Sequence, residues 1–123
     1  MSHRVERAQD LIRKEVSRLL LYKVKDPTLS SVSVTAVKMT ADLRRAQILY
    51  SVYDDAVDRA EIQTRLDKAT GFFRREIARV VELRFVPEIV FEFDRALEYA
   101  RHMDKVLTDL GRPTGEKDNG RPE

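Results

Sequence analysis

The part of the sequence that most restricts the possible fold is the stretch from residue 62 to residue 93, because the spacing of its apolar residues changes partway. Through its first part, apolar residues recur every three or four positions, which is the spacing of one helical face. These residues are Ile62, Leu66, Ala69, Phe73, Ile77 and Val80. Further on the period becomes two, and the alternating residues are Ile89, Phe91 and Phe93, interleaved with Glu88, Val90 and Glu92. The stretch therefore predicts helical structure that leads directly into a half-buried strand.

The middle of this stretch contains a signal for a helix break, the sequence Ala69-Thr70-Gly71. A glycine inside a helix costs about 1 kcal/mol relative to alanine, so Gly71 weakens the helix where the apolar face passes through it. The apolar spacing continues across Gly71, and the pattern is compatible with one long helix as well as with two short ones. We expect Ala69, Thr70 and Gly71 to form a kink.

Two further helices are predicted from the same kind of spacing. Residues 3–22 are predicted to form a first helix, which should end before Lys25-Asp26-Pro27 because the residue before a proline is disfavoured in helical geometry. Its apolar face holds Val5, Ala8, Ile12, Val16 and Leu19. A final helix is expected from about residue 95, with Asp94 as its cap.

Two strands are predicted between residues 32 and 52. The inward-facing residues are Val32, Val34 and Ala36 in the first strand, and Ala46, Ile48, Tyr50 and Val52 in the second. A short loop at residues 40–44 joins them, so they suit an antiparallel hairpin with one buried face. Asp54 and Asp55 are turn formers, and either can cap a helix that begins near Ala56.

Together these predictions define an α+β fold with the element order α–β–β–α–α–β and an extra C-terminal helix. Helices must cover one face of the resulting three-stranded sheet. A chain of 123 residues is long enough for one modest core and too short for two. We expect a single domain at residues 1–110. Residues 111–123 are expected to be a disordered polar tail, because they lack large apolar residues whose burial could offset the entropy of ordering.

The composition narrows the classes of function. The sequence has no cysteine, which excludes disulfides, thiolate chemistry and cysteine-ligated metals. No apolar run approaches the roughly 20 residues needed to cross a bilayer, and the charged N-terminus does not resemble a signal peptide, so a cytoplasmic location is the default expectation. The net charge of +2 conceals an excess of basic residues up to residue 87 and of acidic residues after it. This asymmetry is compatible with a polyanionic partner.

Two groups of basic residues are candidate RNA contacts. On a helical projection, one group lies within about a quarter turn, beside the apolar face. Its members are Arg65, Lys68, Arg75 and Arg79. Such a row can contact phosphates, and it can also be an ordinary solvated helix face. The second group is more scattered. Arg44 and Arg45 lie at the predicted hairpin tip, Arg74 points toward a different side of the helical stretch, and Arg84 can extend the basic area.

Three aromatic residues near these positions invite a base-stacking interpretation. They are Phe72, Tyr50 and Tyr53. Large aromatic side chains are more often buried than exposed, so we predict that all three pack in the core.

The sequence offers little for an enzyme. The two histidines, His3 and His102, lie in the first and last predicted helices, and the chain has no nucleophile motif, glycine-rich phosphate loop or HExxH pattern. The acidic residues Asp54, Asp55 and Asp58 are explained by helix capping and the helix dipole. We therefore predict no catalytic activity, no metal site and no cofactor.

A series of short motifs follows in order along the chain. They are Arg4-Val5, Val24-Lys25-Asp26-Pro27, Val32-Ser33-Val34-Thr35-Ala36-Val37, Asp42-Leu43-Arg44-Arg45-Ala46, Lys68-Ala69-Thr70-Gly71-Phe72-Phe73-Arg74 and Leu83-Arg84-Phe85-Val86-Pro87-Glu88. In this order and spacing the sequence resembles the ribosome-binding factor A family, bacterial assembly factors of the small ribosomal subunit. The similarity runs from about Arg4 to Leu110.

The resemblance implies a KH-like fold of the type that begins with a helix. Ordinary KH domains use a GxxG loop between two helices to hold the backbone of a single strand. Here Ala69-Thr70-Gly71 takes that place, which favours binding of folded RNA through charged surfaces. The family also implies a monomer that binds the free or immature 30S subunit and its 16S rRNA. It further implies help in processing the 5′ end of that rRNA, a part in cold adaptation, and no catalysis.

Two alternatives stay open at the level of the sequence. A generic KH-like binder of single-stranded RNA would prefer single strands to ribosomal particles, and the absence of GxxG disfavours it. A protein–protein adaptor would use the exposed face of the sheet or the final helix, and its binding would be insensitive to salt.

Overall fold

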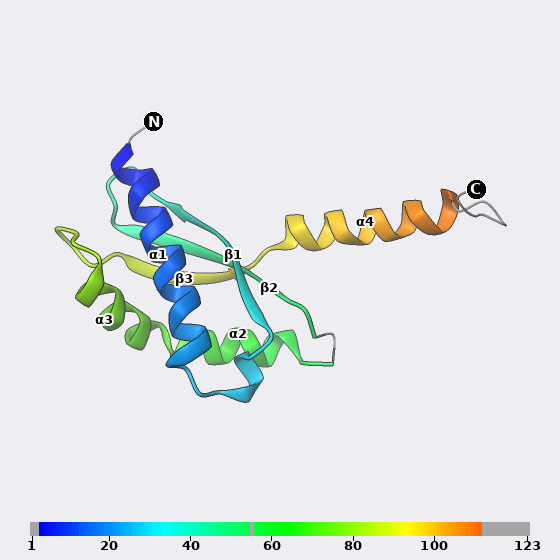
Figure 1. Ribbon diagram of the computed structural model, residues 1–123, viewed down its shortest axis with the longest axis horizontal. Coiled ribbons are helices and arrows are strands. Elements are labelled where there is room, and N and C mark those ends of the chain that lie inside the picture. The colour runs from blue at the N-terminus through cyan, green and yellow to red at the C-terminus, as the bar shows by residue number, and fades with distance from the viewer. Residues whose placement is uncertain (1–2, 55, 112–123) are drawn as a thin grey trace.

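The computed structural model describes residues 3–54 and 56–111, which form a three-stranded sheet with helices (Figure 1). The elements are α1 (His3–Tyr22), the short 3-10 helix η1 (Pro27–Leu29), β1 (Val32–Met39), β2 (Arg45–Val52), α2 (Arg59–Lys68), α3 (Thr70–Val80), β3 (Glu88–Phe93) and α4 (Arg95–Gly111). The predicted α+β order with its extra C-terminal helix is confirmed. The predicted disordered tail lies outside the described residues, apart from Gly111 at the end of α4.

The sheet has the strand order β1-β2-β3. β1 and β2 pair antiparallel, as a hairpin requires, whereas β3 runs parallel to β2 with Arg45 opposite Glu88. A parallel neighbour needs a long crossover, and here α2 and α3 supply it. The loop before β3 consequently lies beside the hairpin tip before β2.

One apolar core joins the sheet to α1, α2 and α3. Its largest fully buried members are Ile12, Val16 and Leu19 of α1, Ile62 and Leu66 of α2, Phe73 and Ile77 of α3, and Ile48, Tyr50 and Phe91 of the sheet. Phe73 meets Phe91 edge to face, with ring centroids 5.0 Å apart. Half of these core residues come from the stretch between residues 62 and 93. That stretch therefore contributes a large part of the core, as its apolar pattern predicted.

β1 differs from its predicted alternation. The register shifts between Val34 and Ala36, which marks a β-bulge at Thr35. After the bulge the buried residue is Val37, while Ala36 is only half-buried. The predicted inward row of Val32, Val34 and Ala36 is therefore wrong at its last member, because a bulge changes which side of the sheet the following residues face.

The helix break falls at Ala69 rather than at Gly71. Ala69 ends α2 and precedes α3 with φ −92° and ψ 0°, and its N–H still bonds to the carbonyl of Arg65 at 3.1 Å. Gly71 is an ordinary residue of the first turn of α3. The structure thus has two short helices, and the glycine is not the residue that bends the chain.

Two helix ends also differ from the prediction. α2 begins at Arg59, and its cap is Asp58, whose side chain accepts a hydrogen bond from the Ala60 N–H at 2.9 Å. Asp54 instead accepts from the Ala56 N–H in the preceding turn, and Asp55 lies outside the described residues. At the end of α3, Val81 is buried and Val80 is 53% exposed, so the apolar row continues in steps of four to Val81.

The last helix, α4, extends away from the body (Figure 1). None of its residues 95–110 is buried. Asp94 precedes the helix, and its carboxylate accepts the Leu97 N–H at 3.0 Å and the Thr35 hydroxyl at 2.6 Å. The predicted cap is confirmed, and the same side chain ties the start of α4 to the bulge in β1.

Candidate nucleic-acid interface

The row of basic residues predicted along the helical stretch is divided between two helices. We call Arg65, Lys68, Arg75 and Arg79 the basic ridge; the first two belong to α2 and the last two to α3. All four side chains are exposed. The change of direction at Ala69 separates the ridge into two halves on either side of the helix break.

The members of the basic ridge differ in how far their charge is already neutralised. Arg65 donates to Asp26 at 3.0 Å and to Glu61 at 2.7 Å, and these hydrogen bonds raise the pKa of Arg65. Arg79 lies 3.6 Å from Glu76. Within the described part of the chain, no carboxylate lies at ion-pair distance from Lys68 or Arg75. Lys68 and Arg75 therefore have the charges most available to a phosphate.

Arg74 has a structural contact that its sequence position did not reveal. Its guanidinium donates to the carbonyl of Pro87 at 3.1 Å and to the carbonyl of Val86 at 3.2 Å. Pro87, the residue directly before β3, is fully buried. Arg74 thus holds the loop between α3 and β3 in place, and only the remaining donors of its guanidinium can face a ligand.

The hairpin tip is built by polar contacts among residues 40–45. Asp42 accepts the Thr40 hydroxyl at 2.7 Å and the Arg44 N–H at 3.1 Å, and these bonds lower the pKa of Asp42. Leu43 has a positive φ of 63°, which is uncommon for a residue with a side chain. The turn presents Arg44 and Arg45 as exposed side chains.

The hairpin tip and the loop before β3 meet at an aromatic ring. The guanidinium of Arg44 lies 4.3 Å from the centroid of Phe85, and that of Arg84 lies 5.6 Å from it. We call Arg44, Arg84 and Phe85 the Phe85 cluster. The sequence placed Arg44 and Arg84 in separate candidate areas, whereas the fold brings both to one ring.

The predictions for the other aromatic residues are mixed. Tyr50 is 1% exposed, and its hydroxyl donates to Gln63. Phe72 is half-buried and packs against the core, as predicted. Tyr53 is 72% exposed, so its predicted burial is wrong. It follows the end of β2, and its hydroxyl bonds to the Ser30 carbonyl at 3.0 Å on the surface.

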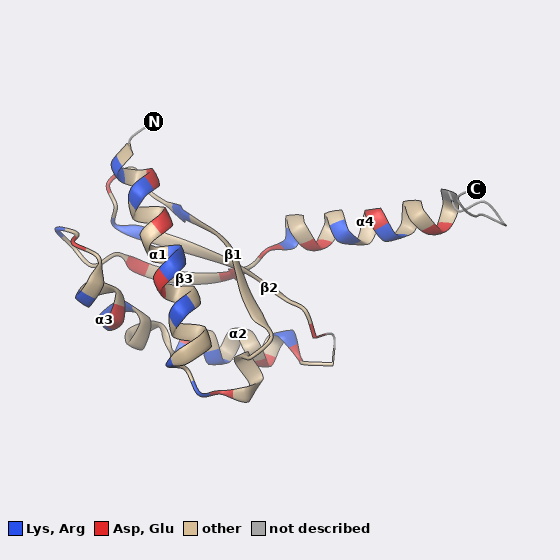
Figure 2. Ribbon diagram, in the orientation of Figure 1, with Lys and Arg blue, Asp and Glu red and all other residues tan. Residues whose placement is uncertain are grey.

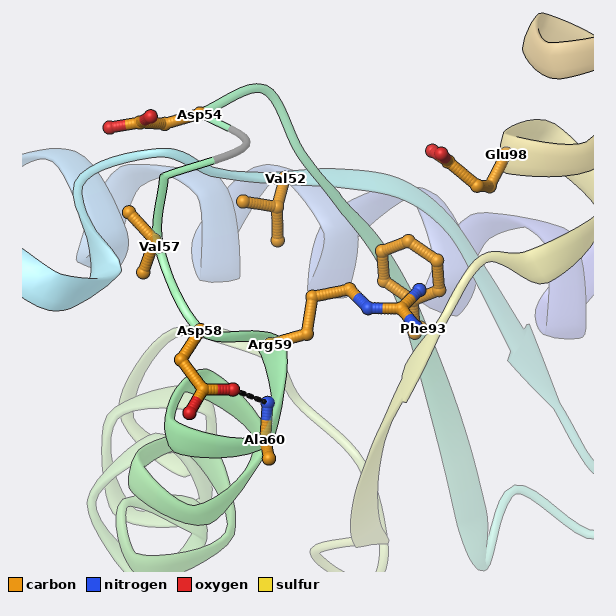
Figure 3. Close-up of a pocket in the computed structure, with 8 residues that line it drawn as sticks. All are labelled: Val52, Asp54, Val57, Asp58, Arg59, Ala60, Phe93 and Glu98. Atoms are coloured by element: carbon orange, nitrogen blue, oxygen red, sulfur yellow. Dashed lines mark hydrogen bonds between the residues drawn. The ribbon is translucent and has the colours of Figure 1, made fainter.

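A recess of about 610 Å³ lies between the end of β2, the start of α2 and the start of α4 (Figure 3). Arg59 lies over the ring of Phe93, 4.1 Å from its centroid. The other charged side chains on its wall are Asp54, Asp58 and Glu98. Three carboxylates against one guanidinium disfavour a polyanion, so this recess is not part of the candidate interface.

Over the described ranges, no three histidine, cysteine or acidic residues are grouped as a metal site would require. The helices of the same ranges are all too short or too polar to cross a membrane. In Figure 2, the ribbon positions of basic residues are distributed over α1, the hairpin tip, α2, α3 and α4, with acidic positions among them.

The element order, the helix break in place of a GxxG loop and the exposed basic residues define a KH-like α+β protein with a basic surface. The particular family follows from comparison with known proteins. The family model described as "Ribosome-binding factor A" matches residues 4–107, so the chain belongs to the ribosome-binding factor A family.

Curated relatives agree along nearly the whole chain. The ribosome-binding factor A of Lacticaseibacillus casei is 42% identical over 113 residues, which cover 91% of this chain and 97% of the relative. That of Dictyoglomus thermophilum is 44% identical over 112 residues, covering 90% of this chain and 93% of the relative.

Solved structures show the same fold. The crystal structure of ribosome-binding factor A from Thermus thermophilus superimposes with a TM-score of 0.66 at 18% identity, covering 74% of this chain and 97% of that one. A Thermus thermophilus homology model, fitted into the cryo-EM map of a complex between the 30S subunit and ribosome-binding factor A, gives a TM-score of 0.54 at 22% identity, covering 69% of this chain and 93% of that one.

Proposed function

We propose that this chain is a cytoplasmic assembly factor that binds immature 30S subunits and assists maturation of their 16S rRNA, including its 5′ end. The observation that carries the proposal is membership of the ribosome-binding factor A family over residues 4–107. The fitted Thermus thermophilus model supports the 30S subunit as the partner, because its own complex is with that particle.

The proposed mechanism is non-catalytic. A bound factor changes the equilibrium between immature and mature rRNA conformations only if it binds the two with different affinities. The described residues offer exposed charged surfaces and a recess with three carboxylates and one guanidinium on its wall. Occupancy would therefore hold the rRNA in one conformation, and release would mark the next stage of assembly.

The proposed contact surface is the basic ridge together with the hairpin tip. Lys68 and Arg75 lie next to the helix break, where an ordinary KH domain has its GxxG loop. An Arg or Lys that neutralises a phosphate releases condensed counterions, so binding should weaken with salt. A protein partner at a neutral surface would show little of that dependence.

The variant that tests this surface replaces Lys68, Arg75 and Arg79 by alanine. We expect weaker binding to immature subunits and a slope of log affinity against log salt that is smaller by roughly two to three. The matched control replaces Arg13, Lys14 and Arg18 of α1, which carry the same total charge but lie beside Asp10 and Glu15. If both triple variants weaken binding equally, the basic ridge acts only through the net charge of the protein and is not the specific contact.

A second candidate function is supported by α4. Tyr99, Leu107 and Leu110 are between 61% and 79% exposed on a helix that covers none of the core. Such a helix suits a protein–protein adaptor, which could act on the same particle through a ribosomal protein. Weaker binding on removal of α4, with an unchanged salt dependence of the remaining affinity, would favour this role over the basic ridge.

A further inference from the structure

Phe85 differs from the other phenylalanines in this protein. It is 47% exposed, whereas the other four are buried or half-buried in or against the core. It lies in the loop between α3 and β3, where neither the helical nor the strand pattern required an apolar residue. Single exposed apolar residues are common on protein surfaces, so the neighbours of Phe85, and not its exposure alone, decide what it can do.

The position of Phe85 is fixed from both ends of its loop. Val81 is buried before it and Pro87 is buried after it. Arg74 donates to the carbonyls of Val86 and Pro87, and the Glu88 N–H bonds to the carbonyl of Arg44 at 2.8 Å. The last bond joins the loop directly to the hairpin tip. These contacts fix the backbone of the loop relative to the hairpin tip, and the Phe85 ring lies against the Arg44 guanidinium.

The two guanidiniums of the Phe85 cluster have positive charges that an anionic partner could bind. Each lies within the roughly 6 Å at which a cation is attracted to an aromatic ring. Within the described ranges, no carboxylate lies at ion-pair distance from Arg44 or Arg84. The Arg44 guanidinium covers one face of the Phe85 ring, so a base would stack on the face that Arg44 leaves open. A partly exposed ring beside two arginines without carboxylate partners has the composition of a single-stranded nucleic-acid platform, in which a base stacks and phosphates meet the cations.

We propose that an unpaired base of the pre-ribosomal RNA stacks on Phe85, while Arg44 and Arg84 contact the phosphates on either side of it. This inference rests on the proposed function and adds a contact to it. It assigns the hairpin tip to a single-stranded segment, because a base within a duplex has no free face to offer. The contact is tolerant of sequence, since every base has a π-face.

Because the chain has no tryptophan, a Phe85→Trp variant carries a single reporter at the proposed contact. Labelling it with 5-hydroxytryptophan separates its emission from that of ribosomal proteins, and titration with immature 30S particles then reads out stacking. Tyr22→Trp, at the exposed end of α1, is the matched control. We expect strong quenching at position 85 and none at position 22.

Affinity gives an independent measurement on the same particles. Phe85→Leu keeps an apolar side chain and removes the π-face, and we expect binding to weaken roughly tenfold. Phe85→Tyr should restore near wild-type binding. Tyr22→Leu loses an exposed aromatic residue outside the cluster and should bind like the wild type.

Each outcome has a distinct meaning. If the wild type binds, position 85 is unquenched and Phe85→Leu binds within about twofold of wild type, base stacking is wrong while the proposed function stands. Emission that shifts to the blue without loss of intensity would place residue 85 against apolar protein, and would also overturn the inference. If the wild type fails to bind immature particles at low salt, the proposed function fails and the stacking contact fails with it.

Discussion

At the scale of single residues, two neighbouring arginines have different contacts and therefore different roles. Arg74 and Arg75 adjoin in the sequence, yet Arg74 holds two backbone carbonyls and Arg75 lies over the helix break, with its Nη1 3.5 Å from where a Cβ on Gly71 would be. Helical spacing places both on an exposed surface, but it does not show which one has a partner within the fold.

The role of Arg74 predicts a specific pattern of variants. Arg74→Lys keeps the charge but cannot reproduce the guanidinium geometry that reaches both carbonyls. We expect it to lower the free energy of unfolding in urea by about 1 kcal/mol, as Arg74→Ala should, while binding to immature subunits keeps its salt dependence. Full stability of Arg74→Lys, together with weak subunit binding by Arg74→Ala, would identify Arg74 as an RNA contact instead.

The site was only partly predictable at this scale. The sequence identified Arg44, Arg45 and Arg84 as exposed basic residues, and the structure places them at the surface. It did not single out Phe85, because a lone aromatic residue in a loop has no periodicity that marks it as exposed. The sequence also predicted that Tyr53 is buried, whereas this residue is exposed just beyond the last paired residue of β2.

At the scale of elements, the break between α2 and α3 raises the question of whether Gly71 is needed for it. Gly71 has room for a methyl group, since the nearest atom to an added Cβ would be the flexible end of Arg75 at 3.5 Å. Because alanine favours helix more than glycine does, Gly71→Ala should raise the free energy of unfolding by about 0.5 kcal/mol.

The control for that variant is Ala78→Gly, at an exposed position within α3. It should lower the free energy of unfolding by about 1 kcal/mol in the same denaturation experiment. A loss of stability in Gly71→Ala would show that the break needs a glycine, contrary to the helical conformation of residue 71.

Asp94 links two elements, and its protonation should be visible in the stability of the protein. Its hydrogen bonds with Thr35 and with the Leu97 N–H lower the pKa of Asp94. A carboxylate with a lowered pKa in the folded state stabilises the protein fully above its unfolded value near 3.9, and this contribution is lost as the pH falls through the folded pKa.

Asp94→Asn should therefore reduce the pH dependence of the melting temperature below about pH 4. Asp104→Asn, in the exposed part of the same helix, is the control and should leave that dependence unchanged. Parallel pH profiles of wild type and Asp94→Asn would show that the carboxylate gains nothing from its two partners.

At the scale of the whole molecule, the fold was largely predictable because its apolar pattern is strong. The order of elements followed from helical spacing in α1, α2 and α3 and from alternation in β2 and β3. The bulge in β1 was not predictable, since Thr35 and Ala36 fit either side of a strand. The contact between the hairpin tip and the loop before β3 was also not predictable. It follows from the parallel pairing of β2 and β3, which the sequence pattern does not specify.

The central claim is that the protein binds immature 30S subunits selectively, through a basic surface. The most direct measurement is sedimentation of the purified protein with immature and with mature 30S subunits, at low and at moderate salt. We predict that it co-sediments preferentially with the immature particles and that moderate salt weakens this binding. Failure to bind either particle at low salt, or equal and salt-insensitive binding to both, would contradict the claim.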